Sequence, residues 1–478
     1  MAEQQPGEGR AWGALALIFV GSRVALHMTG VHIEVGRPAL HVLDPEVLAH
    51  SPARALWNLH MQPPGLTALT ALVVQLPEGA QVPAAEWLFS ALGALATGCL
   101  YWLVRELGAP PRWALTAAVV YCLGSEALLY ERLFYYPLPL AAALLLGMCA
   151  ALRFFERGST GSALLAVASF TAMTLTYALF HPLWLLLVFA LLSVGARAGK
   201  HAARALLTAC ALSALLVAGV VLKNGVRFGS YGLTSWTGMN LATTTHWLDP
   251  EGLQAMVDRG ELSPVSRVLP FEGLTAVERA AGAPRHPPEL WALRTSSGHW
   301  NYNHAAVVGL ARRYAADWRR AMGHAPERYL RSLAHSLHAT FLRPSADFRP
   351  LSAQRARVAA YADVQDHLFG RVASGVPARE GELRGRSRMW HRITHGAPLL
   401  ALALVVTLGV ALRRAWQSDG VRVHWWRLAA LMLVWSMLLP ALVNRGEGNR
   451  IRVVVGPLLV AVFVTALREW SARRAARH

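Results

Sequence analysis

A short polar stretch near the N-terminus contains residue types that could move a proton. Asp44 and Glu46 flank Pro45, and His60 and Gln62 follow in the same stretch. A carboxylate at a membrane surface could take a proton from an acceptor hydroxyl, with Asp44 as the first candidate and Glu46 as the second. The Asp-Pro pair is equally typical of a helix start, because Asp caps helices and Pro suits their first turn. Both interpretations of Asp44 stay open.

The end of this stretch could bind an anion. His60 and Gln62 stand directly before Pro63-Pro64, where a helix is expected to begin. A helix start offers free amide hydrogens and a partial positive charge, which suit a phosphate group. A protonated His60 could add a positively charged donor. Alternatively, His60 is an interfacial histidine with no special role.

Lys223 and the residues after it form a second candidate region for phosphate and sugar. Lys223 precedes Gly225 and Gly229, and Trp236 and Asn240 follow. A lysine beside Gly-rich backbone can hold phosphate as a point charge. Trp236 could stack on a sugar ring, and Asn240 joins it as a candidate substrate contact. The alternative is a lysine whose long stem reaches the membrane interface, near an interfacial tryptophan.

Three other polar residues could also contact substrate. Glu131 lies beside Arg132 at the end of an apolar stretch, so it could belong to a site or form a local ion pair at the headgroup level. Asn303 and His304 are residue types that bind sugar hydroxyls, although the same types form turns and helix caps.

A cluster of arginines precedes the last apolar stretch. Glu447, Arg450 and Arg452 lie there, and Arg445 brings the number of arginines to three. Arginines on the outer face run against the positive-inside tendency of membrane proteins. A diphosphate or lipid phosphate would explain their position. No Gly-rich nucleotide loop is present, so a nucleotide-sugar donor is not expected.

The elements that must position these residues are membrane helices. The chain has 478 residues, of which 54% are hydrophobic, and its apolar runs are long enough to cross a bilayer. We therefore predict an all-α polytopic membrane bundle of about ten to twelve spans. The clear spans are 11–29, 84–104, 113–130, 137–154, 161–179, 182–195, 203–222, 396–412, 427–443 and 452–468, with 64–76 and 328–342 ambiguous.

The charge pattern favours a membrane protein over a nucleic-acid-binding one. The net charge of +18 comes almost entirely from arginine, which suggests a GC-rich bacterial genome. The basic junctions between spans fall on one side when the ten clear spans cross the membrane, so both termini are expected in the cytoplasm. The first apolar stretch lacks a cleavage site and is expected to stay in place. We predict a multi-pass protein of the bacterial inner membrane, with its site on the extracytoplasmic side.

Three regions follow from this pattern. Residues 1–222 form an N-terminal membrane block with the outer catalytic loop 30–63, and residues 223–395 form an extracytoplasmic region of short helices lying along the membrane. Residues 396–478 form a C-terminal membrane block. The four cysteines fall inside apolar spans without ligand spacing, so neither a disulfide nor a metal site is expected.

The order of these motifs resembles a known family. Asp44-Pro45-Glu46, His60-Met61-Gln62-Pro63-Pro64 and the stretch from Glu131 to Pro137 are similar to motifs of the membrane-embedded glycosyltransferases of the GT-C type, as is the arginine cluster before the last span. The likeness is closest to bacterial members related to polyprenyl-phosphate-dependent mannosyl and aminoarabinose transferases. Many relatives have adjacent acids where this chain has Pro45 between Asp44 and Glu46.

The resemblance implies a function. It implies a helical bundle that transfers one sugar from a polyprenyl phosphate to a glycan, lipid or protein acceptor, with inversion at the anomeric carbon. It also implies that Asp44 is the base and that the His60 stretch contacts the donor phosphate. The family is divided on metal use, and we predict no cofactor. A transporter or flippase, and a polysaccharide ligase, are the alternatives.

Overall fold

The computed structural model is helical throughout the part of the chain that it describes. The described residues are 8–33, 41–195, 199–246, 250–272, 274, 287–342, 356–358, 361, 397–417, 420–443 and 448–475. Within them no strand occurs, only an isolated bridge between Arg294 and Trp300. The prediction of an all-α fold is thus confirmed.

Six described helices are long and apolar enough to cross a membrane, as expected for a multi-pass membrane protein. They are α1 (Glu8–Met28), α5 (Glu78–Glu106), α8 (Pro137–Arg157), α11 (Lys200–Phe228), α23 (Arg422–Val443) and α24 (Gly448–Ala475). Shorter apolar helices are α4 (Pro64–Val74), α9 (Thr160–Thr176) and α10 (Pro182–Val194), and α22 spans Ala397–Trp416. Every predicted span therefore lies on helix, while the count of ten to twelve crossings stays a prediction.

One predicted span is broken. The expected span 113–130 is two helices, α6 (Pro111–Cys122) and α7 (Ser125–Tyr130). Gly124 separates them in an extended conformation, and its amide donates to the Tyr121 carbonyl at 3.0 Å. Both parts are apolar, so the apolar pattern along the chain did not reveal the turn.

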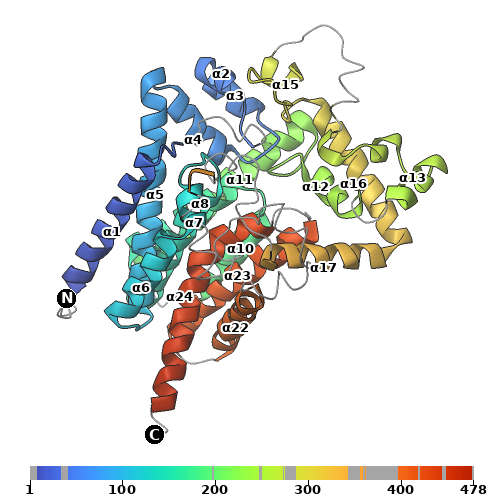
Figure 1. Ribbon diagram of the computed structural model, residues 1–478. Coiled ribbons are helices and arrows are strands. Elements are labelled where there is room, and N and C mark those ends of the chain that lie inside the picture. The colour runs from blue at the N-terminus through green and yellow to red at the C-terminus, as the bar shows by residue number, and fades with distance from the viewer. Residues whose placement is uncertain are drawn as a thin grey trace.

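The most buried helix of the bundle is α8. It packs against α5, α9, α23 and α24, and 78% of its most apolar window is buried. Figure 1 shows α1, α5 and α24 running towards the end of the molecule where both termini lie. α1 therefore begins, and α24 ends, at the same end of the molecule, while the side of the membrane that this end faces stays a prediction.

Several further helices lie away from both termini in Figure 1. They are α2 (Pro45–His50), α3 (Pro52–Asn58), α12 (Thr237–His246), α13 (Pro250–Asp258), η1 (Pro264–Arg267), η2 (Pro270–Glu272), α15 (Pro288–Trp291), α16 (Ala306–His324) and α17 (Pro326–Leu342). The last of them, α17, reaches back to the side of α23. We refer to this set as the outer layer. It draws helices both from the predicted loop 30–63 and from the predicted region 223–395.

The boundary predicted at 222/223 falls inside a helix. α11 continues without a break from Lys200 to Phe228, and α17 of the outer layer packs against α23 and α24. The outer layer is therefore joined to both membrane blocks by packed helix.

Candidate functional site

Asn303 binds the loop that joins α3 to α4. Its side chain is fully buried, and its Oδ1 accepts from the backbone amides of His60 at 2.8 Å and Met61 at 3.1 Å. Its Nδ2 donates to the carbonyls of Asn58 and Glu289 at 3.0 and 3.1 Å. A single amide side chain thus satisfies four backbone groups, and this set of contacts is called the Asn303 clamp below. We expected sugar hydroxyls as the partners of Asn303, whereas the four described hydrogen bonds of its side chain all go to backbone groups.

His60 lies inside this clamp and is neutral. The ring is fully buried, its Nδ1 lies 2.9 Å from the Ser235 hydroxyl, and its face meets Phe228 with 4.5 Å between ring centroids. Burial lowers the pKa of His60 to about 3, against a smaller raising effect of the Asn303 contact. Burial therefore opposes the expected positive charge on His60, because an apolar surrounding disfavours the charged ring.

Within the loop from Leu59 to Pro63, two buried side-chain atoms have no hydrogen-bond partner among the described residues, as is also true of Oδ1 of Asn58 and Oε2 of Glu289 beside the clamp. The two atoms of the loop are Nε2 of His60 and Oε1 of Gln62, and both side chains are buried. Because buried polar groups are nearly always satisfied, these two atoms are the positions in this loop most suited to a polar ligand. Both belong to residues that the sequence motif singled out.

Lys223 reaches the same loop from α11. Its Nζ donates to the carbonyl of Leu59, so an ammonium group lies next to the backbone of His60. Arg312 of α16 donates to the carbonyls of Phe228 and Gly229 at the end of the same helix. The end of α11 is thus bound to two segments of the outer layer.

Trp236 and His304 are buried supports of the outer layer. Trp236 packs against Phe271 and Tyr302, and its indole donates to the Tyr302 carbonyl at 3.5 Å. His304 accepts the Ala306 amide at 3.1 Å, and burial lowers its pKa. Asn240 follows on α12, with its amide bonded to the Trp236 carbonyl at 2.9 Å.

Asp44 is a helix cap that also binds a distant loop. Its Oδ1 accepts the Glu46 amide at 3.1 Å at the start of α2. Ser296 donates its amide to Oδ2 and its hydroxyl to Oδ1, both at 2.6 Å. The capping interpretation is therefore confirmed, and it leaves the carboxylate partly accessible. Glu46 is exposed in the first turn of α2.

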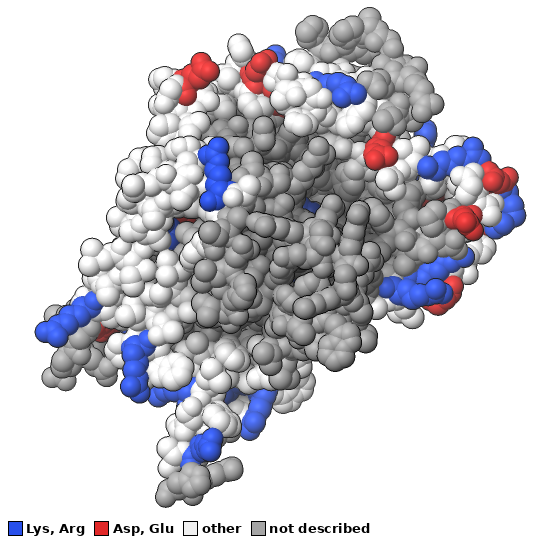
Figure 2. All heavy atoms as spheres, in the orientation of Figure 1, with Lys and Arg blue, Asp and Glu red and all other residues white. Residues whose placement is uncertain are grey.

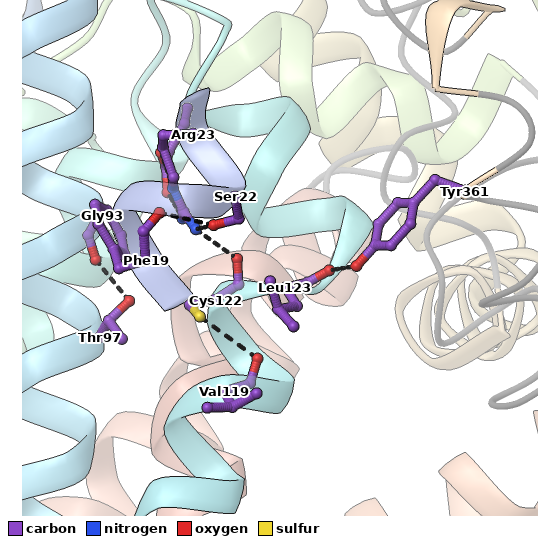
Figure 3. A network of polar contacts seen from close by, with 10 residues as sticks. Phe19, Ser22, Arg23, Gly93, Thr97, Val119, Cys122, Leu123 and Tyr361 are labelled. Carbon is purple, nitrogen blue, oxygen red and sulfur yellow. Dashed lines mark hydrogen bonds and ion pairs between the residues drawn. The ribbon is translucent and has the colours of Figure 1, made fainter. Parts of the chain in front are cut away.

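Glu131 belongs to a separate, charged cluster within the bundle. It is buried and pairs with Arg23 of α1, whose Nε donates to Oε2 at 2.9 Å. Arg23 also donates to the carbonyl of Cys122 at 2.9 Å, as Figure 3 shows, and it lies over the Phe19 ring. A Cβ at Gly93 of α5 would clash with the Glu131 carboxylate. Glu131 therefore joins three helices of the bundle, and its predicted pairing with neighbouring Arg132 is replaced by one with Arg23.

The two arginines at the start of α24 differ in their partners. Arg452 is buried and pairs with Glu126 at 3.0 Å, so its charge is compensated. Arg450 donates to the Tyr135 hydroxyl at 3.1 Å. Glu447 lies outside the described residues. The arginine cluster thus meets α7 and the residues that follow it, across more than three hundred residues of sequence.

A cluster of aromatic rings connects Arg450 to the first loop. His41 packs against Tyr135, Tyr136 and Trp236, with ring centroids 5.1, 5.5 and 5.4 Å away, and Tyr177 stacks on Tyr136 at 4.1 Å. His41 precedes Asp44 by three residues. Sequence analysis did not single out His41 or Tyr177, and neither has a spacing signal, because the cluster forms only in three dimensions.

The candidate residues therefore fall into groups. His60, Gln62, Lys223, Asn303 and His304 come together around one loop, and Trp236 connects that loop through His41 and Tyr135 to Arg450. Asp44 with Ser296, and Glu131 with Arg23, are held by other contacts. Glu289 and Asn58, buried against each other at 2.7 Å, were missed, and nothing in their spacing indicated them.

Charged side chains on one face are unevenly distributed. In Figure 2 the described acidic residues lie mostly over the outer layer, whereas Lys and Arg predominate at the end where the termini lie.

No protein-family model matches this sequence, and no curated protein matches it either. The chemistry must therefore be argued from the site.

Proposed function

We propose that this protein is a membrane glycosyltransferase that moves a single sugar from a polyprenyl-phosphate donor to a glycan, lipid or protein acceptor on the extracytoplasmic face. The donor chain lies in the bilayer, so the site must sit where membrane helices meet a polar layer. The enzyme needs a base, cationic groups for the phosphate and an enclosed pocket for the sugar. In this proposal Asp44 is the base, transfer occurs with inversion, and neither a cofactor nor nucleic acid takes part.

The observation that carries the proposal is the connection between Arg450 and the first loop. Arg450 contacts Tyr135, Tyr135 packs on His41, and His41 packs on Trp236. Aromatic rings beside a guanidinium group suit a sugar attached to a phosphate, because rings stack on sugar faces and Arg binds phosphate oxygens in a fork. Lys223, beside Leu59, offers a second cation nearby along the same loop.

The contact between Asp44 and Ser296 supports a base at this position. The Ser296 hydroxyl donates to the Asp44 carboxylate at 2.6 Å, which is the geometry that a general base needs towards an acceptor hydroxyl. An acceptor that displaces Ser296 would give its proton to Asp44 while its oxygen attacks the anomeric carbon. The phosphate leaves with the bonding electrons, and the configuration inverts.

A deletion strain that lacks this protein tests the class of reaction. We expect a deletion strain to lack one sugar from a glycan or lipid and to accumulate the matching polyprenyl-phosphate sugar. Glycan and lipid mass spectrometry would measure both, and the reintroduced wild-type chain should restore the profile. An unchanged glycan and lipid profile would overturn the proposal.

The Asp44→Asn variant tests the base. Asn caps helices about as well as Asp, so the fold is retained while the proton acceptor is lost, and transfer should fall by about 10²–10⁴-fold. Asp44→Ala should lose activity and, in addition, about 1 kcal/mol of stability. Ser296→Ala is the matched control, since it removes the partner and keeps the carboxylate. Near-normal transfer by Asp44→Asn in proteoliposomes would exclude this residue as the base.

A transport function has one observation in its favour. Arg23 of the apolar helix α1 forms a buried ion pair with Glu131 at the end of α7, and such pairs often mark substrate pathways. A transporter would accumulate labelled polyprenyl-phosphate sugar or free sugar inside proteoliposomes without forming a new glycosidic bond. Product analysis of the same vesicles separates the two functions.

A further inference from the structure

A second cluster of chemically active residues lies where α1 ends. His27 is in the last turn of α1, His32 follows the turn at Gly30, and Glu86 lies on α5. One potential ligand atom from each lies within 4.8 Å of the others. None of the three belongs to the groups proposed above for sugar transfer.

We propose that His27, His32 and Glu86 bind one Zn²⁺ ion at the outer end of α1. Two imidazoles and one carboxylate are a ligand set that zinc prefers, and three protein ligands leave a fourth position for water. Zinc bonds of about 2.0–2.1 Å place tetrahedral ligand atoms about 3.4 Å apart. The side chains of His27 and His32 are 59% and 49% exposed, so rotation about their side-chain torsions can close the remaining distance.

The carboxylate of Glu86 is already held in position. Its Oε1 accepts the Ile33 amide at 3.1 Å and lies 3.6 Å from Nη1 of Arg132, while its Oε2 faces His27 at 3.9 Å. Partners of this kind orient a metal ligand through its second oxygen. The nearby Arg132 charge opposes a cation, which restricts the site to a metal that the imidazoles bind strongly. This requirement favours Zn²⁺ over Mg²⁺ or Ca²⁺.

A bound metal would join the start of the first loop to the bundle. His32 lies beyond α1, on the chain that leads to His41 and Asp44, whereas Glu86 lies on α5. Three bonds to one ion would fix the entry to the loop, independently of what the loop does.

Metal binding by the full-length chain tests the site. The purified protein in detergent, stripped with a chelator, would be titrated with Zn²⁺, and with Co²⁺ to detect tetrahedral absorption bands. We expect one tight equivalent in the wild type and an affinity at least ~100-fold weaker in His27→Ala and His32→Ala, since even outer-shell changes cost 10–100-fold. Zn²⁺ should also raise the melting temperature of the wild type and leave that of both variants unchanged.

His50→Ala is the matched control, because His50 is an exposed histidine of the outer layer whose Nδ1 bonds to the Glu46 carbonyl. It should keep the tight equivalent. Both ligand histidines are exposed, so the variants are expected to fold, and equal melting temperatures of the chelated proteins would verify this. Absence of a tight equivalent in the wild type, or its survival in both variants, would overturn the site.

Discussion

The Asn303 clamp and the Arg23–Glu131 pair join distant parts of the chain by different means. Asn303 lies 243 residues from His60 and binds it with a neutral amide, next to a neutral imidazole. Arg23 lies 108 residues from Glu131 and binds it as a guanidinium–carboxylate pair. The clamp holds loops of the outer layer, whereas the ion pair joins helices of the apolar bundle.

The difference follows from what each region can tolerate. Loops expose backbone amides and carbonyls that need partners, and one amide side chain supplies both a donor and an acceptor. A charge within an apolar bundle is costly unless it is paired and hydrogen-bonded. Arg23 meets this requirement through Glu131, Cys122 and Ser22. The comparison predicts that removing one partner harms the bundle more than the clamp.

Arg23→Ala should have the largest effect on stability. It leaves the buried Glu131 carboxylate without its guanidinium partner, which is expected to lower the free energy of unfolding by about 3–5 kcal/mol. Unfolding in mixed detergent micelles would measure the change, with the exposed Arg10→Ala on the same helix as control. The double variant Arg23→Ala/Glu131→Ala should recover part of the loss. If Arg23→Ala is no more harmful than Arg10→Ala, the pair does not stabilise the bundle.

Asn303→Ala should have the second largest effect. Four backbone groups lose their side-chain partner, and unsatisfied buried groups cost about 1–3 kcal/mol each, with some relief from relaxation. We therefore expect a loss of about 2–4 kcal/mol, measured by the same unfolding. Faster proteolysis between α3 and α4 should accompany it. Ser297→Ala, at an exposed position of a nearby loop, should change neither; an equal loss in both variants would argue against the clamp.

His60 should make stability depend on pH, and over the interval from pH 6.5 to 5 this is the smallest of the three effects. Its pKa is about 3 in the folded chain, below the ordinary 6.5. As the pH falls from 6.5 towards 3, the unfolded chain binds a proton that the folded chain excludes, so stability falls by up to ~1.4 kcal/mol per pH unit. Above pH 6.5 both states are neutral and the contribution is flat.

The His60→Asn variant isolates this dependence. Its amide cannot titrate, so the fall in melting temperature between pH 6.5 and 5 should be smaller than in the wild type. The exposed His50→Ala should keep the wild-type slope. A slope in His60→Asn equal to that of the wild type would show that His60 is accessible to protons in the folded state.

The sequence was sufficient for the helices and insufficient for their contacts. Apolar runs located every predicted span on helix, because burial in lipid or protein requires an apolar sequence of a definite length. They missed the break at Gly124, where α6 ends and α7 begins with Ser125 and Glu126, because the surrounding residues are apolar enough to continue the pattern. The division at 222/223 relied on a change of composition, yet hydrogen bonds continue the helix to Phe228.

The candidate site was predicted in part for the same reason. Residue types marked the His60 loop, and the structure does bring Lys223 and Asn303 to it. Spacing in sequence carries no information about partners that lie far apart in the chain, so the Arg23–Glu131 pair and the aromatic contacts of His41 had no signal. The neutral state of His60 also depends on burial, which is a property of the folded chain.

The length of α11 has a consequence for dissecting this protein. Its 29 residues span about 43 Å, compared with about 30 Å for a hydrocarbon core. The end of α11 that carries Lys223 therefore extends beyond the core, towards the outer layer, as continuous helix. A fragment that begins at 223 would keep only the last six residues of α11 and would lose the apolar part of this helix. Expression of the fragment that begins at 223 should therefore fail to give folded protein, whereas a fragment that begins at 199 retains the whole of α11.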